Sequence, residues 1–171
     1  MKLIRQIALT TMLTVGAFSA ITYTSCNKDA CKDVVCQNSG TCSDGVCTCT
    51  TGYSGTKCET AVRTTYVGTY VGNGSDNDGG TYTGWGLTFG LSGTDATAMT
   101  LVVVDENTAP QLSFTVKLTS NTTFTVDSKT SGNFTYTGTG TISASSASLS
   151  LSEHNNVLNT TTVYTYASMV R

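Results

Sequence analysis

Apolar and polar residues alternate with a period of two through most of the chain beyond residue 60. The clearest stretch runs from Leu112 to Leu118, where apolar residues alternate with Ser, Thr and Lys. This spacing predicts a strand with one buried face and one solvent-exposed face. The same alternation, interrupted by Gly, Asn, Asp and Ser, predicts further strands at residues 66–71, 82–91, 98–104, 124–126, 134–137, 142–151 and 162–170.

The helical period of about 3.6 residues is not found in this part of the chain. About eight short strands with many β-branched threonines are typical of an antiparallel β-barrel or β-sandwich. The alternation indicates which residues face inward, but it leaves the choice between barrel and sandwich open. We therefore predict a Thr-rich all-β domain over residues 60–171, preceded by segments of a different kind.

The first residues have the organisation of a secretory signal peptide. Lys2 and Arg5 give a positive start, and a mostly apolar stretch follows at residues 7–18. Small residues come next, as they do before a cleavage site. The apolar stretch is too short and too often interrupted by threonine for a membrane-spanning helix. We expect residues 1–25 to direct export, which would place the protein in an oxidising compartment.

All seven cysteines lie between Cys26 and Cys58, and the last six follow the spacing C-x4-C-x5-C-x4-C-x-C-x8-C. With Gly-Tyr-Ser-Gly before the last cysteine, this pattern resembles an EGF-like domain, expected at residues 31–59. So short a segment cannot bury enough apolar surface to fold alone, so disulfides replace a core. Spacing alone leaves the pairing open. The resemblance implies the bridges Cys31–Cys42, Cys36–Cys47 and Cys49–Cys58.

Cys26 is left over from this pattern and calls for its own explanation. Preceded by Thr24-Ser25, it resembles the site where bacterial lipoproteins are cleaved and acylated, although Tyr23 stands where leucine is usual. The resemblance implies palmitate-type acylation of Cys26, with residues 26–30 as anchor and short linker. Asn27 after the cysteine implies the outer membrane, and the stretch 27–29 resembles a surface-export tail. The alternative is ordinary cleavage at 17–20, which would leave Cys26 as a free or intermolecular thiol.

Metal binding has little support in the sequence. The C-x2-C spacing of zinc sites is absent from the cysteine pattern. Calcium-binding members of the EGF-like family carry an acidic cluster before the first cysteine, whereas Asp29 stands here beside Lys28. The acidic, glycine-rich stretch 72–80 lacks the final Glu of an EF-hand loop, and we interpret it as a flexible hairpin loop. We predict no metal site, keep calcium as an open alternative, and interpret the cysteine module as a stapled spacer.

Charge and residue types argue against two functional classes. The net charge is −2 and the basic residues are not grouped, so nucleic acid is not an expected partner. The single histidine, His154, lies in a polar stretch that we interpret as a loop, and no G-x-S-x-G motif occurs. We therefore predict no enzyme, no catalytic residue and no cofactor.

Three functional hypotheses remain for the β domain. The leading one is a lipid-anchored cell-surface binding or adhesion protein with an unknown protein or glycan ligand. Trp85 and several tyrosines would then form a stacking platform, unless they serve only as core. Another of the three hypotheses is a structural envelope component without a ligand.

The remaining hypothesis is a small-molecule carrier. The segment 66–70 resembles the G-T-[WY] start of lipocalin-like β-barrels, which implies a barrel with an apolar cavity. Such a cavity requires small inward residues. The candidates are Gly84, Gly86, Gly90 and Ala144.

Overall fold

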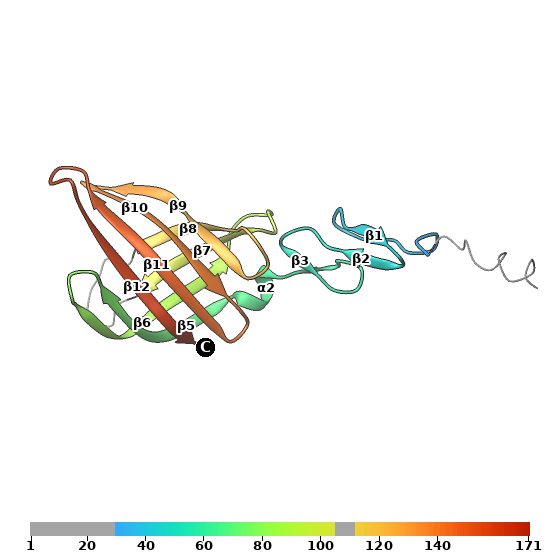
Figure 1. Ribbon diagram of the computed structural model, residues 1–171, viewed down its shortest axis with the longest axis horizontal. Helices are drawn as coiled ribbons and strands as arrows, with labels where there is room; N and C mark the ends of the chain where they lie inside the picture. Colours follow the sequence, from blue (N-terminus) through green and yellow to red (C-terminus); the bar gives the residue numbers. More distant parts are fainter. Residues whose placement is uncertain (1–29, 105–111) are drawn as a thin grey trace, which may run out of the picture.

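The computed structural model describes residues 30–104 and 112–171, so the expected signal peptide and Cys26 lie outside the described residues. A cysteine-rich module is followed by a β-barrel, and the module extends from one end of that barrel (Figure 1). We call this end of the barrel proximal and the opposite end distal. Among the described residues, no helix is long and apolar enough to cross a membrane.

The cysteine-rich module, residues 30–61, consists of two small hairpins and their loops. β1 (Thr41–Ser43) pairs with β2 (Val46–Thr48), and β3 (Tyr53–Ser54) pairs with β4 (Thr60–Ala61). The first hairpin turns at Asp44 and Gly45, which both have the positive φ that a tight turn requires. The three disulfides are Cys31–Cys42, Cys36–Cys47 and Cys49–Cys58, the pairs that the EGF-like resemblance implied.

Eight antiparallel strands form the barrel. They are β5 (Gly68–Asp76), β6 (Thr81–Leu91), β7 (Ala98–Val104), β8 (Leu112–Leu118), β9 (Thr123–Ser131), β10 (Phe134–Ile142), β11 (Ser146–Asn155) and β12 (Thr160–Val170). Each strand pairs with the next along the chain, and β12 pairs with β5 to close the barrel. The predicted mainly β fold is confirmed, and the choice that the sequence left open is decided in favour of a closed barrel.

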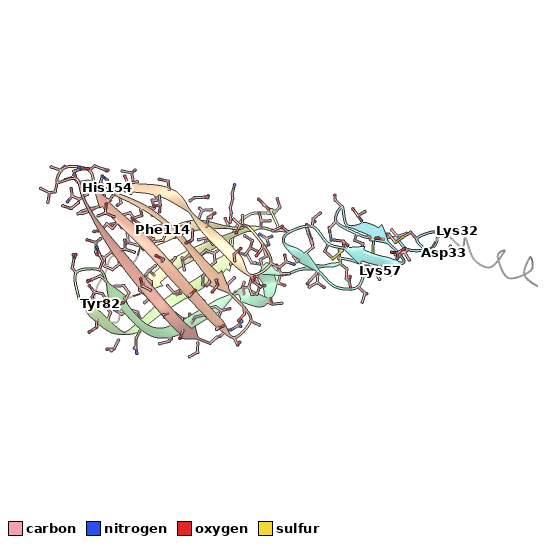
Figure 2. The ribbon with its side chains drawn as sticks, viewed as in Figure 1. Lys32, Asp33, Lys57, Tyr82, Phe114 and His154 are labelled. Atoms are coloured by element: carbon pink, nitrogen blue, oxygen red, sulfur yellow. A yellow bond between two sulfur atoms is a disulfide. The ribbon has the colours of Figure 1, made fainter. Side chains whose placement is uncertain are left out.

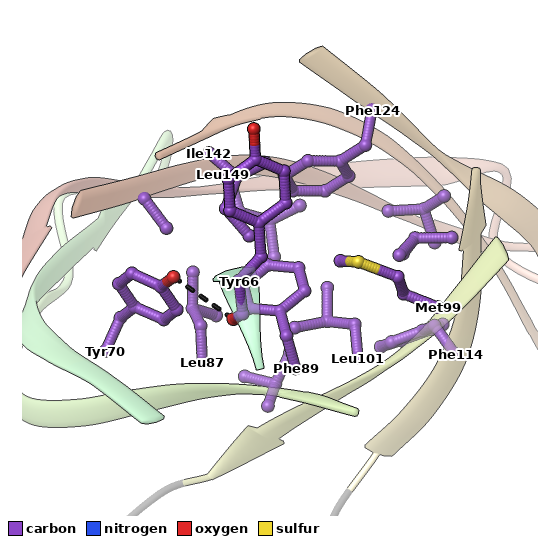
Figure 3. Packing of buried hydrophobic residues seen from close by; sticks show 14 of the residues in the cluster. Tyr66, Tyr70, Leu87, Phe89, Met99, Leu101, Phe114, Phe124, Ile142 and Leu149 are labelled. Atoms are coloured by element: carbon purple, nitrogen blue, oxygen red, sulfur yellow. Dashed lines mark hydrogen bonds between the residues drawn. The ribbon is translucent and has the colours of Figure 1, made fainter. Parts of the chain in front are cut away.

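Inward side chains from the strands form one hydrophobic core, part of which is drawn in Figure 3. Near the proximal end, the Phe89 ring packs edge-on against Tyr70 and Phe124, with ring centroids 5.7 and 5.4 Å apart. The Tyr70 hydroxyl donates to the backbone carbonyls of Tyr66 at 3.1 Å and Ser143 at 2.8 Å. This buried hydroxyl therefore has hydrogen-bond partners. Large aromatic side chains fill the proximal part of the barrel, and the phenol of Tyr70 is not left unsatisfied there.

Two strands extend beyond their predicted ends because glycines occupy inward positions. A Cβ added at Gly74 of β5 would lie 3.1 Å from the ring of Tyr166, its partner on β12. A Cβ added at Gly140 of β10 would collide with the ring of Phe124, its partner on β9. Large side chains on neighbouring strands therefore cover the glycines, and the apolar alternation disappears locally. The loop predicted at 72–80 is wrong for its first half, which belongs to β5.

A one-turn helix, α2 (Arg63–Tyr66), lies at the proximal end between the module and β5 (Figure 1). Tyr66, predicted to begin a strand, instead ends this helix and is buried in the core. The Arg63 guanidinium donates to the carbonyls of Ser92 at 2.9 Å and Ala98 at 3.0 Å, which joins the helix to the β6–β7 connection. A single helical turn is too short to produce a visible 3.6-residue period, so the sequence pattern did not predict it.

The last loop of the module is docked on the proximal loops of the barrel. The Asn121 amide donates to the carbonyl of Tyr53 at 2.9 Å, and its side-chain oxygen accepts from the backbone nitrogen of Gly52 at 2.8 Å. Gly52 is so close to the barrel that an added Cβ would lie 3.1 Å from the carbonyl oxygen of Ala96. The module is therefore attached to the barrel by specific hydrogen bonds as well as by the chain itself.

Candidate functional site

Five aromatic side chains near the distal end form what we call the distal aromatic cluster: Tyr82, Trp85, Phe134, Tyr136 and Tyr164. They belong to β6, β10 and β12. Tyr136 is part of the buried core, whereas Trp85, Phe134 and Tyr164 are only partly buried and pack against it. Figure 2 shows Tyr82 at the end of the barrel away from the module. Inward aromatic side chains that remain partly exposed offer apolar contact area to a ligand.

Strand register places two carboxylates beside these rings. Tyr164 on β12 is paired with Asp76 on β5, and Tyr136 on β10 is paired with Glu153 on β11. Because directly paired residues in a sheet point to the same face, both carboxylates point inward with the aromatic side chains. The barrel therefore combines aromatic faces and negative charge at its distal end.

The rings around Trp85 are tilted relative to one another. The Trp85 ring centroid lies 5.1 Å from that of Tyr82 at an interplanar angle of 51°, and 5.4 Å from that of Tyr166 at 36°. Tyr82 and Tyr164 are 6.4 Å apart at 49°. The ring planes are therefore inclined to one another and do not form one flat stacking platform.

Asp76 is held as a charged carboxylate by the turn that follows it. Its Oδ1 accepts from the backbone nitrogens of Asp78 at 2.9 Å and Gly80 at 2.8 Å, and its Oδ2 accepts from the Tyr82 hydroxyl. The Tyr82 hydrogen bond, with those of the backbone, lowers the pKa of Asp76 below its ordinary value. The same bond raises the pKa of Tyr82 to about 12. At neutral pH Asp76 is therefore ionised, and Tyr82 is a neutral donor.

Negative charge also affects the pKa values of the other two tyrosines of the cluster, Tyr136 and Tyr164. Burial raises the pKa of Tyr136 to about 12, with a further contribution from the hydrogen bond that it donates to Glu153. Burial also raises the pKa of Tyr164, and the charges of Glu153, Asp76 and Asp78 add to this effect. The carboxylates of Glu153, Asp76 and Asp78 therefore all act on the phenol of Tyr164.

Lys129 lies where β8 and β9 separate. The register of these two strands covers only the proximal part, from Leu118 with Phe124 to Val116 with Val126. Further toward the distal end, the Lys129 ammonium donates to the carbonyl of Ser113 on β8 at 2.6 Å and lies 5.7 Å from the centroid of the Phe114 ring. This lysine bridges the two diverging strands, and because it is paired with Tyr136 it points inward beside the distal aromatic cluster.

His154 lies on a strand, and its position corrects the sequence interpretation of a loop. Residues 153–155 complete β11, where His154 is paired with Thr135 and Thr161. Its Nδ1 is hydrogen-bonded to the Thr161 hydroxyl at 3.0 Å. Because Glu153 faces inward, its neighbour His154 faces outward and lies apart from the distal aromatic cluster. The period-two spacing of Leu149, Leu151 and Glu153 could have identified this inward carboxylate.

Two of the three glycines that suggested a hollow barrel, Gly86 and Gly90, lie on its outer face. A Cβ added at Gly86 would meet a methyl group of Thr69 at 3.4 Å, and one at Gly90 would meet the Thr100 hydroxyl at 2.7 Å. Both glycines alternate with the buried residues Leu87 and Phe89, so they point away from the core. They do not enlarge the interior.

A concave surface lies outside the barrel, over β9 to β12. It is a shallow, open groove lined mainly by threonine and serine, including Thr125, Thr139, Thr141, Ser148, Ser150 and Thr165. These side chains are neutral hydroxyls on the solvent-facing side of the strands. The groove is chemically unlike the distal aromatic cluster.

No family model, curated protein or solved structure matches the chain.

Proposed function

We propose that the protein is a lipid-anchored binding protein of a bacterial cell surface and that ligands contact the distal aromatic cluster. The observation that carries this proposal is the partial exposure of Trp85, Phe134 and Tyr164 at inward positions of the barrel. Phenylalanine usually reaches full burial when it serves only as core, whereas Trp and Tyr more often keep some exposure, so the exposure of Phe134 weighs most. Aromatic surface left accessible at the end of a barrel is a usual site of ligand contact.

The position of the expected anchor supports this proposal. Acylation of Cys26 would attach the chain to the outer membrane just ahead of the module, because only a few residues separate it from Cys31. The module, which we take as EGF-like, docks through Gly52 on the proximal end of the barrel. The distal aromatic cluster would then face away from the membrane, toward the surroundings of the cell.

A lipocalin-like small-molecule carrier is the second candidate. A closed barrel of eight strands is favourable for it, since such barrels are just wide enough for side chains or one small ligand. Tyr70, Phe89 and Phe124 occupy the proximal part of the interior. A carried ligand would therefore be restricted to the distal part and contact the same aromatic cluster.

The anchor is tested by labelling cells with a fatty acid that carries a chemical handle. We expect label on the wild-type chain and none on a Cys26→Ser variant, together with digestion of the wild-type chain by protease added to intact cells. Label retained by Cys26→Ser, or full protection from protease, contradicts a surface lipoprotein.

Ligand binding is tested with Trp85, the single tryptophan of the chain, as a fluorescent reporter. The full chain with the Cys26→Ser change is titrated with neutral sugars, organic anions, organic cations and aromatic compounds. We expect at least one class to change the emission of Trp85 with saturation, and a Tyr82→Ala/Tyr164→Ala variant to bind that class at least about tenfold more weakly. The control is Thr165→Ala, which alters the exposed outer face of the same strand as Tyr164. Binding that the double variant retains in full contradicts the proposed site.

A further inference from the structure

We infer that the distal aromatic cluster recognises an organic cation, such as a quaternary ammonium or amine group. This inference rests on the proposed function and specifies the ligand class of the same site. It follows from the distribution of charge, the angles between the rings and the hydrogen bonds of the two inward carboxylates.

Charge is distributed unevenly between the two ends of the barrel. Asp76 and Glu153 point inward at the distal end, and Asp78 lies in the adjoining turn. Among the described residues, Lys129 is the only basic side chain toward the distal end. The others lie in the module or at the proximal end: Lys32, Lys57, Arg63, Lys117 and Arg171. The field at the distal end therefore favours a positive ligand.

The cation that the fold itself supplies there is already engaged. Lys129 is paired with Tyr136 and therefore also points inward, but its ammonium donates to the carbonyl of Ser113 and lies over the Phe114 ring. The inward side chains of Asp76 and Glu153 thus carry two negative charges against this one engaged ammonium. Tyr164 lies between these two carboxylates in the strand order, so both act on its side chain.

The ring geometry favours a cation over a flat sugar. Stacking of a sugar uses one exposed aromatic face or several nearly coplanar ones, whereas Tyr82 and Trp85 are tilted by 51° and Tyr82 and Tyr164 by 49°. A compact cationic head group can contact faces that meet at such angles, and each ring attracts it through its negative face.

Asp76 is better suited to act by charge than by direct hydrogen bonding. Asp76 already accepts from Tyr82 and two backbone nitrogens, and Glu153 accepts from Tyr136. Asp76 therefore keeps about one of its roughly four lone-pair sites for a ligand hydroxyl, whereas Glu153 keeps more. Their negative charge persists and acts on a cation that is held by the neighbouring rings.

The experiment compares choline with 3,3-dimethylbutan-1-ol, which has the same shape but a neutral tert-butyl group in place of the trimethylammonium group. Both are titrated into the full chain carrying Cys26→Ser, with Trp85 emission as the readout. We expect choline to bind at least about fivefold more tightly than the neutral alcohol, because only choline gains the cation–π and charge attraction. High salt should reduce this preference.

A charge variant makes the test specific to the site. Glu153→Gln keeps the shape and an acceptor for Tyr136 while removing the charge, so choline should bind about three- to tenfold more weakly and the neutral alcohol unchanged. The control Glu59→Gln removes the same charge from the module and should alter neither affinity.

The outcomes separate the two proposals. Equal binding of choline and the alcohol, or preference for a sugar or an anion in the same titration, overturns the cation inference but leaves ligand binding at the distal aromatic cluster in place. Failure of every class to change Trp85 emission overturns both.

Discussion

The docking of the module on the barrel predicts a measurable effect for Asn121→Ala. This change removes the two side-chain hydrogen bonds to Gly52 and Tyr53. Each such bond contributes about 1 kcal/mol net, and backbone groups left without partners in a partly buried contact add to the loss. We therefore expect the free energy of unfolding to fall by about 2 to 3 kcal/mol.

The assay combines guanidinium unfolding, followed by Trp85 emission, with amide hydrogen exchange at Val62. The Val62 amide donates to the carbonyl of Gly52 at 2.9 Å, so its exchange reports whether the docked loop opens. The matched control is Asn73→Ala, an exposed position on the outer face of β5. A loss below about 0.5 kcal/mol for Asn121→Ala, with unchanged exchange at Val62, would refute the docked module and indicate a tether instead.

Further changes test the glycine positions, the acid and base behaviour, and the disulfides. Gly140→Ala should cost about 2 kcal/mol in thermal unfolding because its Cβ collides with a neighbouring ring and backbone, whereas Gly86→Ala should cost little. Folding lowers the pKa of the Asp76 carboxyl, so the charged carboxylate stabilises the folded state above its unfolded pKa. This contribution is lost as the pH falls through the folded-state pKa. Asp76→Asn should therefore reduce the loss of stability in acid. The pKa of Tyr82 is raised to about 12, so its stabilisation is complete below the unfolded pKa and is lost as pH rises toward 12; alkaline titration of phenol absorbance checks this. Cys49→Ala should lower the stability of the module by about 2 to 4 kcal/mol, so that proteases cleave it faster, while Trp85 emission stays native. Loss of the native emission, which would mean that the barrel unfolds too, would contradict this.

The sequence predicted the architecture well where side chains alternate without interruption. Residues 112–118 form a strand with the expected buried face, and the six paired cysteines form the expected bridges. The period of two is local, because it can be read without knowing which strand is the neighbour. The bridges were implied by the resemblance to an EGF-like domain and not by the spacing alone. The closure of the barrel depends on pairing between β5 and β12, which no local pattern contains.

The strands that contain inward glycines were predicted too short for a physical reason. The inward position at Gly140 is filled by Phe124 of the next strand, so the apolar residue that would mark it belongs to another part of the sequence. The same holds for Gly74 and Tyr166. A pattern read along one strand cannot reveal a space filled from its neighbour.

The candidate site was predicted only in part. Trp85 and several tyrosines were predicted to be either a platform or core. Trp85, Tyr82 and Tyr164 are inward but partly exposed, whereas the other tyrosines belong to the buried core: Tyr66, Tyr70, Tyr136 and Tyr166. The carboxylates of Asp76 and Glu153 were assigned to loops because polar residues surround them. The period-two spacing from Leu149 and Leu151 could have identified Glu153 as inward, whereas its position beside Tyr136, and that of Asp76 beside Tyr164, depend on cross-strand register.

The most direct test of the central claim is an NMR titration of the isotope-labelled full chain carrying Cys26→Ser, with choline as the ligand. We predict that shift changes concentrate at residues 76–85, 134–136, 153 and 164, where the distal aromatic cluster and its carboxylates lie. Changes confined to the outer groove at Thr139, Ser150 and Thr165, or no changes at all, would contradict the account.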